Sequence, residues 1–387
     1  MIDPVQLTTD LIRCPSVTPI EGGALDLLEA TLSELGFTCT RLPFSEAGTE
    51  TVDNLYARIG TTAPHICFAG HTDVVPVGDV AAWKKGPFDG TIQDGMIWGR
   101  GASDMKGAIA AFVAATERHL KSISSLTGSI SFLITGDEEG PSVNGTVKMV
   151  DWLRDRNEVI DACIVGEPTN PNEMGEMIKI GRRGSVNGIL RVDGTQGHVA
   201  YPHLANNPVP IMVKLLAALN EETLDTGTEY FQASNLEITS MDVGNQTTNV
   251  IPSTATARFN IRYNDIWNRD SISQWIHERL ASARLDYHLD LFHTADCFRT
   301  ETQAGSGGFV DHLSASVEEI TGRKPDLSTS GGTSDARFIK NICPVIEFGL
   351  IGQTMHKVDE NTSVKSVEQL AEIYHGGRRL SFPCHGI

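Results

Sequence analysis

Several short apolar runs in this 387-residue sequence end directly in a glycine followed by polar residues. The run 65–69 leads into Gly70 and His71, the run 128–134 leads into an acidic loop, and the run 162–165 leads into Gly166 and Glu167. Apolar runs of this length, separated by helical patterns, are typical of buried strands in an α/β domain. Sites in such domains collect at the carboxyl ends of the strands, so we expect these polar residues to meet.

Local patterns predict the other elements of this domain. Leucines at helical spacing predict two helices within 5–36, and residues 55–59 form a further strand candidate. Residues 105–120 carry an apolar helical face, and Asp104 stands where it could cap that helix.

The pattern changes near Gly184 and returns to α/β after about residue 296. Between these points we predict strands at 185–193, 236–243, 254–263 and 287–292, with helices at 208–219 and 271–283. The order β-α-β-β-α-β is the ferredoxin-like arrangement. We therefore predict a first domain of residues 1–183 and 296–387, and a second domain, 184–295, inserted into it. The small antiparallel sheet of the insert leaves an edge strand that a second copy can cover.

Composition excludes several classes of protein. The formal net charge of -18 argues against nucleic acid as the main partner, which needs clustered Lys and Arg. No apolar stretch is long enough to span a membrane, and the first residues do not resemble a signal peptide. The seven scattered cysteines include no CxxC pair, so we expect a cytoplasmic protein.

The polar residues that follow the apolar runs could hold metal ions, although each has an ordinary explanation when taken alone. His71 and Asp73 could be turn residues, Asp104 a helix cap, and Glu138 and Glu139 a solvated turn. Glu167 and His356 are unremarkable by themselves. Imidazoles and carboxylates are, however, the N and O ligands that zinc takes, and two zincs sharing a carboxylate form a hydrolytic site. The joint pattern therefore favours a metal centre.

The motifs that carry this pattern resemble those of the dizinc aminoacylase and carboxypeptidase family over nearly the whole chain. They are Arg13–Pro19, His71–Pro76, Trp83 with Pro87-Phe88, Arg100–Gly107, Gly136–Gly140 and Gly166–Thr169. The resemblance implies a mixed-sheet zinc-hydrolase domain with an inserted ferredoxin-like α+β dimerisation domain. It also implies a homodimer that hydrolyses a linear amide bond.

The same resemblance implies a role for each matching residue. His71 and Glu167 would bind one zinc, Glu139 and His356 would bind the other, and Asp104 would bridge the two. Asp73 would support His71, and Glu138 would act as the general acid/base. Two zinc ions per subunit are therefore implied, and cobalt could substitute for them.

Three further runs resemble a subgroup that removes succinyl groups from amino acids: 181–185, 196–203 and 330–335. A small anionic N-acyl amino-acid substrate suits arginine, which binds carboxylates bidentately. The substrate-binding candidates are Arg182, Arg183, Ser185, Asn249, Arg262, Gly332 and Thr333. His198, in the inserted domain, would reach the partner subunit's site and stabilise the oxyanion.

Two positions depart from the family pattern. Thr248 replaces the first of a usual pair of asparagines, and Gly352-Gln353 replaces a common Pro and Asn before His356. Another N-acyl amino-acid deacylase, such as an acetylornithine deacetylase, is the nearest alternative, and the Arg182-Arg183 pair and the 331–335 run disfavour it. A non-catalytic binding protein on the same fold would be expected to lack a ligand or the base, yet all seven of these positions are filled.

Overall fold

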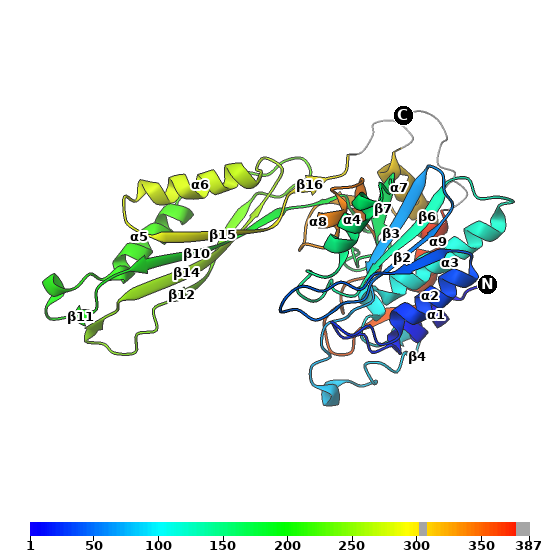
Figure 1. The fold of residues 1–387 in the computed structure, drawn as a ribbon, viewed down its shortest axis with the longest axis horizontal. Coiled ribbons are helices and arrows are strands. Elements are labelled where there is room, and N and C mark those ends of the chain that lie inside the picture. Colours follow the sequence, from blue (N-terminus) through cyan, green and yellow to red (C-terminus); the bar gives the residue numbers. More distant parts are fainter. Residues whose placement is uncertain (302–307, 377–387) are drawn as a thin grey trace. The chain divides into compact units, whose positions relative to one another are not determined.

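A computed structural model describes residues 1–301 and 308–376. The chain divides into two compact units (Figure 1). Unit 1 comprises Met1–Ile180, Thr300–Ser328 and Ser334–Ile387, and unit 2 comprises Gly181–Arg299 and Thr329–Thr333. The sequence did not indicate that 329–333 belong with unit 2. No helix among the described residues is long and apolar enough to cross a membrane.

Unit 1 is built on a mixed eight-stranded sheet. In spatial order its strands are β1 (Thr38–Arg41), β2 (Leu55–Ile59), β6 (Ser129–Thr135), β3 (His65–His71), β7 (Ala162–Val165), β18 (Val345–Glu347), β8 (Met177–Lys179) and β17 (Asp326–Ser328). A separate small sheet contains β19 (Asn361–Ser363), β5 (Met96–Trp98) and β4 (Thr91–Gln93).

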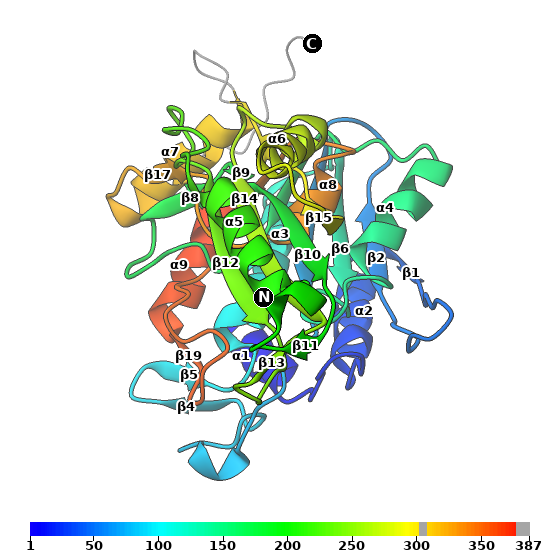
Figure 2. The same cartoon turned by 90° about the vertical axis from the view of Figure 1, so that its left-hand side faces the viewer.

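Helices cover both faces of the large sheet (Figures 1 and 2). On one face α3 (Gly107–Ser122) and α9 (Val364–His375) pack together over the central strands, with Phe112 stacked on Phe68 and touching Tyr374. The other face carries α4 (Thr146–Asp155), where Trp152 packs against Tyr56 of β2. The remaining helices of unit 1 are α1 (Pro4–Ile12), α2 (Ala24–Glu34), α7 (Phe309–Thr321) and α8 (Ala336–Ile339).

The strand order brings the polar loops to one edge of the sheet. Strand β3 lies between β6 and β7 and runs parallel to both. Their carboxyl ends therefore meet at one edge, as expected for an α/β sheet. His71 is the last residue of β3, and the loops that follow β6 and β7 carry Glu138 and Glu167.

The structure corrects the expected helix cap at Asp104. Helix α3 begins at Gly107 rather than at residue 105, and Lys106 occupies the cap position. Asp104 and Met105 have non-helical backbone angles within the turn 102–106 that precedes α3. The Asp104 carboxylate faces two histidines instead of the amide groups at the start of the helix.

Unit 2 contains a four-stranded antiparallel sheet in the order β12 (Asn235–Asp242), β14 (Thr254–Tyr263), β10 (Gly184–Asp193) and β15 (His288–Ala295). Along the chain these strands alternate with α5 (Pro208–Asn220) and α6 (Arg269–Ser282) in the ferredoxin-like order. The core of unit 2 lies between the helices and one face of the sheet, and Phe259 and Tyr263 are its largest fully buried side chains. Two short ladders also belong to unit 2: β9 (Gly181–Arg182) with β16 (Phe298–Arg299), and β11 (Gly197–His198) with β13 (Val250–Ile251).

Candidate metal and catalytic site

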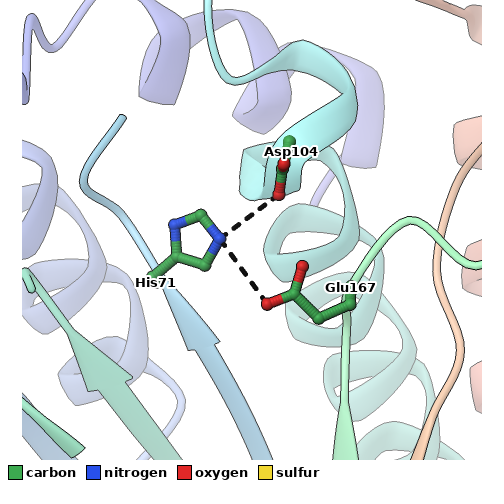
Figure 3. Close-up of side chains that lie close together, drawn as sticks. All are labelled: His71, Asp104 and Glu167. Carbon is green, nitrogen blue, oxygen red and sulfur yellow. Dashed lines mark ion pairs between the residues drawn. The ribbon is translucent and has the colours of Figure 1, made fainter. Parts of the chain in front are cut away.

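Three predicted metal ligands from different segments of unit 1 converge on one point. The Nε2 atom of His71 lies 3.3 Å from Asp104 Oδ1 and 3.8 Å from Glu167 Oε1 (Figure 3). His71 ends β3, Asp104 precedes α3, and Glu167 follows β7. This trio lies at the shared strand edge and could hold one cation.

A second trio shares Asp104 with the first. His356 Nε2 lies 2.7 Å from Glu139 Oε1 and 3.2 Å from Asp104 Oδ2. The two oxygens of Asp104 thus face different histidines, which is the arrangement that a bridging carboxylate requires. His356 has a φ of +62°, a left-handed conformation that is uncommon outside glycine and recurs at functional sites.

The donor atoms of the first trio fit a metal ion. His71 Nε2, Asp104 Oδ1 and Glu167 Oε1 are all buried, and none has a hydrogen-bond partner within the part of the chain that the structure describes. Buried polar atoms are normally paired, because leaving one unpaired costs about 1–3 kcal/mol. Their convergence and their N and O chemistry match what zinc takes in proteins.

The carboxylates within the cluster raise the pKa values of its two histidines. Although burial lowers the pKa of His71, the carboxylates of Asp104 and Glu167 raise it well above its ordinary value. Contacts with Asp104 and Glu139 raise the pKa of His356 to about 10. A cation bound here would displace these protons, since metal ligands must be deprotonated.

Glu138 lies beside the cluster, and its carboxyl group has a raised pKa. Its carboxylate oxygen lies with donor atoms of His71 and Glu139 in a third group. Burial, together with Asp335 and other neighbouring acids, raises the pKa of Glu138 to about 8. A carboxyl group whose pKa lies near neutrality is suited to general acid–base catalysis.

Asp73 contacts His71 differently from the expected arrangement. The Nδ1 atom of His71 hydrogen-bonds the main-chain oxygen of Asp73 at 2.9 Å, whereas the carboxylate lies 3.7 Å away. That carboxylate instead accepts the main-chain N–H groups of Glu138 and Glu139, at 3.2 and 3.0 Å. It also accepts the Thr18 hydroxyl at 2.7 Å. Asp73 therefore anchors the acidic loop directly, and its carbonyl fixes the tautomer of His71.

The predicted substrate-binding residues all lie in unit 2. Ser185 and Arg262 are directly paired across β10 and β14. Arg183 donates to the side chain of Asn235 at 3.0 Å, and Arg182 donates to the carbonyl of Ser330 at 3.2 Å. Burial and the charge of Arg183 lower the pKa of Arg262. Gly332 and Thr333 lie in the segment 329–333 of the same unit.

His198 lies in β11, where it pairs with Val250 of β13, and Asn249 immediately precedes β13; both His198 and Asn249 are exposed. The main-chain oxygen of Asn249 accepts the N–H of Val199 at 3.1 Å. The Nδ1 atom of His198 accepts the N–H of Ala200 at 3.0 Å. Neutral His198 therefore carries its proton on Nε2, which leaves that nitrogen as a hydrogen-bond donor.

Sequence reasoning missed several residues that surround the cluster. Thr18 and Arg100 were noted only as parts of motifs, and Asp335 only as the end of one. No motif contained Glu360, which accepts hydrogen bonds from the turn that carries Asp104. Only the three-dimensional contacts identify Glu360, because a single acid in a loop carries no distinctive pattern.

Comparisons with known proteins find a matching family model and similar sequences over nearly the whole chain. Residues 67–376 match the model of peptidase family M20/M25/M40. A succinyl-diaminopimelate desuccinylase of Bradyrhizobium sp. (strain ORS 278) is 56% identical over 97% of this chain and 98% of its own. The enzyme of that name from Rhodospirillum centenum is also 56% identical, over 96% and 95%.

Solved structures show the same fold at low sequence identity. An M20 family metallo-carboxypeptidase from Sulfolobus solfataricus has a TM-score of 0.74 and 19% identity, covering 97% of this chain and 98% of that one. A dinuclear metal binding peptidase of the M20 family from Bacillus subtilis has a TM-score of 0.68 and 15% identity, with 96% of each chain covered.

Proposed function

This chain belongs to peptidase family M20/M25/M40, and from that premise we propose that it is a metal-dependent succinyl-diaminopimelate desuccinylase. It hydrolyses N-succinyl-LL-2,6-diaminopimelate to succinate and LL-2,6-diaminopimelate, a step in the synthesis of lysine and peptidoglycan precursors. Relatives that bear this name are 55–57% identical over nearly the whole chain. The convergence of two His-and-carboxylate trios on Asp104 supports the metal-dependent chemistry.

We propose two zinc ions per subunit, with cobalt as a possible substitute. His71 and Glu167 would hold one ion, Glu139 and His356 the other, and Asp104 would bridge them. Zinc bound there supplies Lewis acidity toward a carbonyl group and lowers the pKa of water.

Within this site the chain's own residues handle the protons. Glu138 would take the proton of the attacking water and deliver it to the leaving amine, which is the general acid–base role. Asp73 would hold the main chain of Glu138 in place, because its carboxylate binds that N–H group. His198 would donate its Nε2 proton to the developing oxyanion, with Asn249 beside it.

We propose that the cationic residues of unit 2 select the anionic substrate. Arg182, Arg183 and Arg262 would bind its carboxylates, and Ser185, Gly332 and Thr333 would donate hydrogen bonds. An acetylornithine deacetylase would have no acyl carboxylate to bind, so this cationic cluster favours the succinyl substrate over the acetyl one.

We also propose a cytoplasmic homodimer. The six described cysteines are free, as is usual in a reducing compartment. Strand β12 lies at the edge of its sheet and exposes Ile238 and Met241. An exposed apolar edge strand is a surface that a second copy could cover.

The proposal is tested by assaying the purified protein with N-succinyl-LL-2,6-diaminopimelate and with N-acetylornithine, alongside elemental analysis. We expect hydrolysis of the first substrate and about two divalent ions per chain. Active protein without bound divalent metal would refute the metal-dependent mechanism. Preference for N-acetylornithine would refute the substrate assignment.

Glu138→Gln tests the proposed base, because it preserves shape but cannot accept the proton. Turnover should fall by roughly 10²–10⁴-fold while metal content stays near that of the wild type. Glu139→Gln is the matched control and should lose metal, since Glu139 is a proposed ligand. Metal loss in Glu138→Gln with partial activity would mean that the two roles are reversed.

A further inference from the structure

A buried ion pair outside the proposed ligand set lies beside the metal cluster in unit 1. Arg100 Nη1 donates to Glu360 Oε2 at 2.8 Å, and the two side chains are 3% and 1% exposed. Burying two charges is costly, and apolar residues of similar size are often as stabilising. The pair therefore calls for an explanation other than stability alone.

The second oxygen of Glu360 organises the turn that carries Asp104. Oε1 accepts the main-chain N–H groups of Gly101, Ser103 and Asp104, at 3.1, 3.0 and 3.2 Å. The turn can wrap around one oxygen because Gly101 adopts a φ of +86°. Asp104 itself has non-helical backbone angles, so the regular bonds of α3 do not hold it.

The guanidinium of Arg100 reaches the segment that carries His356. Its Nη1 also donates to the carbonyl of Lys357 at 3.0 Å, one residue beyond His356. Its Nη2 donates to the carbonyl of Pro76 at 3.3 Å, in the loop after β3. The ring of Trp83 lies 5.1 Å from the guanidinium carbon, so the group is fixed on a further side.

These contacts connect three of the segments that supply the cluster. His71 ends the strand before the Pro76 loop, Asp104 lies in the turn around Glu360, and His356 precedes Lys357. Among residues 1–301 and 308–376, the hydrogen bonds of Arg100 and Glu360 go to each other and to main-chain groups and not to the proposed donor atoms.

We propose that Arg100 and Glu360 are positioning residues for the metal centre. They fix the main chain of Asp104 and the His356 segment, so both side chains converge before a cation arrives. This inference rests on the metal centre proposed above. Residues that orient metal ligands typically contribute 10–100-fold to metal affinity.

The test measures the affinity for zinc alone, by competition with a chromogenic chelator. Glu360→Gln keeps the shape of the side chain but removes its charge, and should weaken zinc binding by about 10–100-fold. Arg100→Lys keeps the charge but lacks the planar fork that reaches several carbonyls, so it should weaken binding in the same direction. Excess zinc should restore turnover in both variants, because the base Glu138 is intact.

Arg58→Met is the matched control, since it breaks a different ion pair of unit 1, with Glu158. Arg58 contacts Glu158 and Ser129 and none of the proposed ligands. Its zinc affinity should stay within about twofold of the wild type. Unchanged affinity in Glu360→Gln, or an equal loss in Arg58→Met, would overturn the inference. If Glu360→Gln does not fold, the zinc affinity of Arg100→Lys is the test. Unchanged zinc affinity in Arg100→Lys would then overturn the inference. A wild-type protein that binds no zinc would instead refute the proposed metal centre.

Discussion

At the scale of single residues, the surroundings of two arginines suit the anion recognition proposed above. Among residues 1–301 and 308–376, no acid forms an ion pair with Arg183 or Arg262. Burial and the nearby charge of Arg183 lower the pKa of Arg262. Two neighbouring cations without a counter-charge repel each other, and a bound carboxylate would relieve that repulsion.

Arg183→Ala should therefore discriminate between substrates by charge. A hydrogen bond to a charged group contributes about 1.5–3 kcal/mol, so kcat/KM for the succinylated substrate should fall by roughly tenfold to a hundredfold. The loss should be smaller for an analogue whose acyl group lacks the carboxylate. Arg191→Ala, on the exposed part of β10, is the control and should leave kcat/KM for both substrates unchanged. Equal losses for both substrates in Arg183→Ala would indicate a structural role.

A second residue-scale prediction concerns His65, at the start of β3 and far along the strand from His71. His65 is 2% exposed, and its ring contacts the carbonyl of Val159 at 2.7 Å and the hydroxyl of Ser131 at 2.8 Å. Burial lowers the pKa of His65 below its ordinary value. The folded state thus favours the neutral ring, and its contribution to stability is present above the unfolded pKa and is lost as the pH falls.

The thermal midpoint of the wild type should accordingly fall more steeply than that of His65→Gln between about pH 8 and about pH 5.5. Both proteins keep the candidate metal ligands, so the pH dependence of that cluster cancels in the comparison. Parallel curves would show that His65 does not titrate differently in the folded and unfolded states.

At the scale of elements, strand β10 depends on a glycine placed under an aromatic ring. Gly188 pairs directly with Phe259 of β14, and a Cβ atom at Gly188 would lie 2.1 Å from the Cζ atom of that ring. Gly188→Ala should therefore destabilise unit 2 by about 1–3 kcal/mol, the usual cost of overpacking. Denaturant unfolding measures this change in the free energy of unfolding. Adding Phe259→Leu to the Gly188→Ala chain should restore part of the lost stability. An unchanged midpoint for Gly188→Ala would contradict the predicted clash.

Individual strands, helices and loops differ in how well the sequence predicts them. The strands at 55–59 and 162–165 were predicted with the bounds that the structure gives, because apolar runs closed by turn residues mark buried strands well. The start of α3 was predicted wrongly, since a good capping residue such as Asp104 is also a good metal ligand. The role of Asp73 toward the acidic loop was not predicted, because main-chain contacts leave no trace in residue spacing. Glu360 was missed for the same reason.

At the scale of the whole molecule, the loop around His198 has the composition of a contact surface. Near His198, the side chains of Val199, Tyr201 and Leu204 are 46%, 56% and 70% exposed. Clustered exposed apolar side chains often mark protein–protein contacts. We propose that this loop of unit 2 meets the partner subunit and that His198 acts on the partner's substrate.

Mixed dimers test this proposal of a shared active site. His198→Ala and Glu138→Gln should each be nearly inactive alone, because one lacks the oxyanion donor and the other the base. After dissociation and reassociation in equal amounts, about half of the dimers should be mixed. In a mixed dimer, the site built on the His198→Ala chain keeps its own Glu138 and receives an intact His198 from its partner. Since the other site lacks both groups, activity should recover to roughly a quarter of the wild-type value. A mixture of either variant with itself is the control. Proven subunit exchange without recovery would mean that His198 acts within its own chain or outside catalysis.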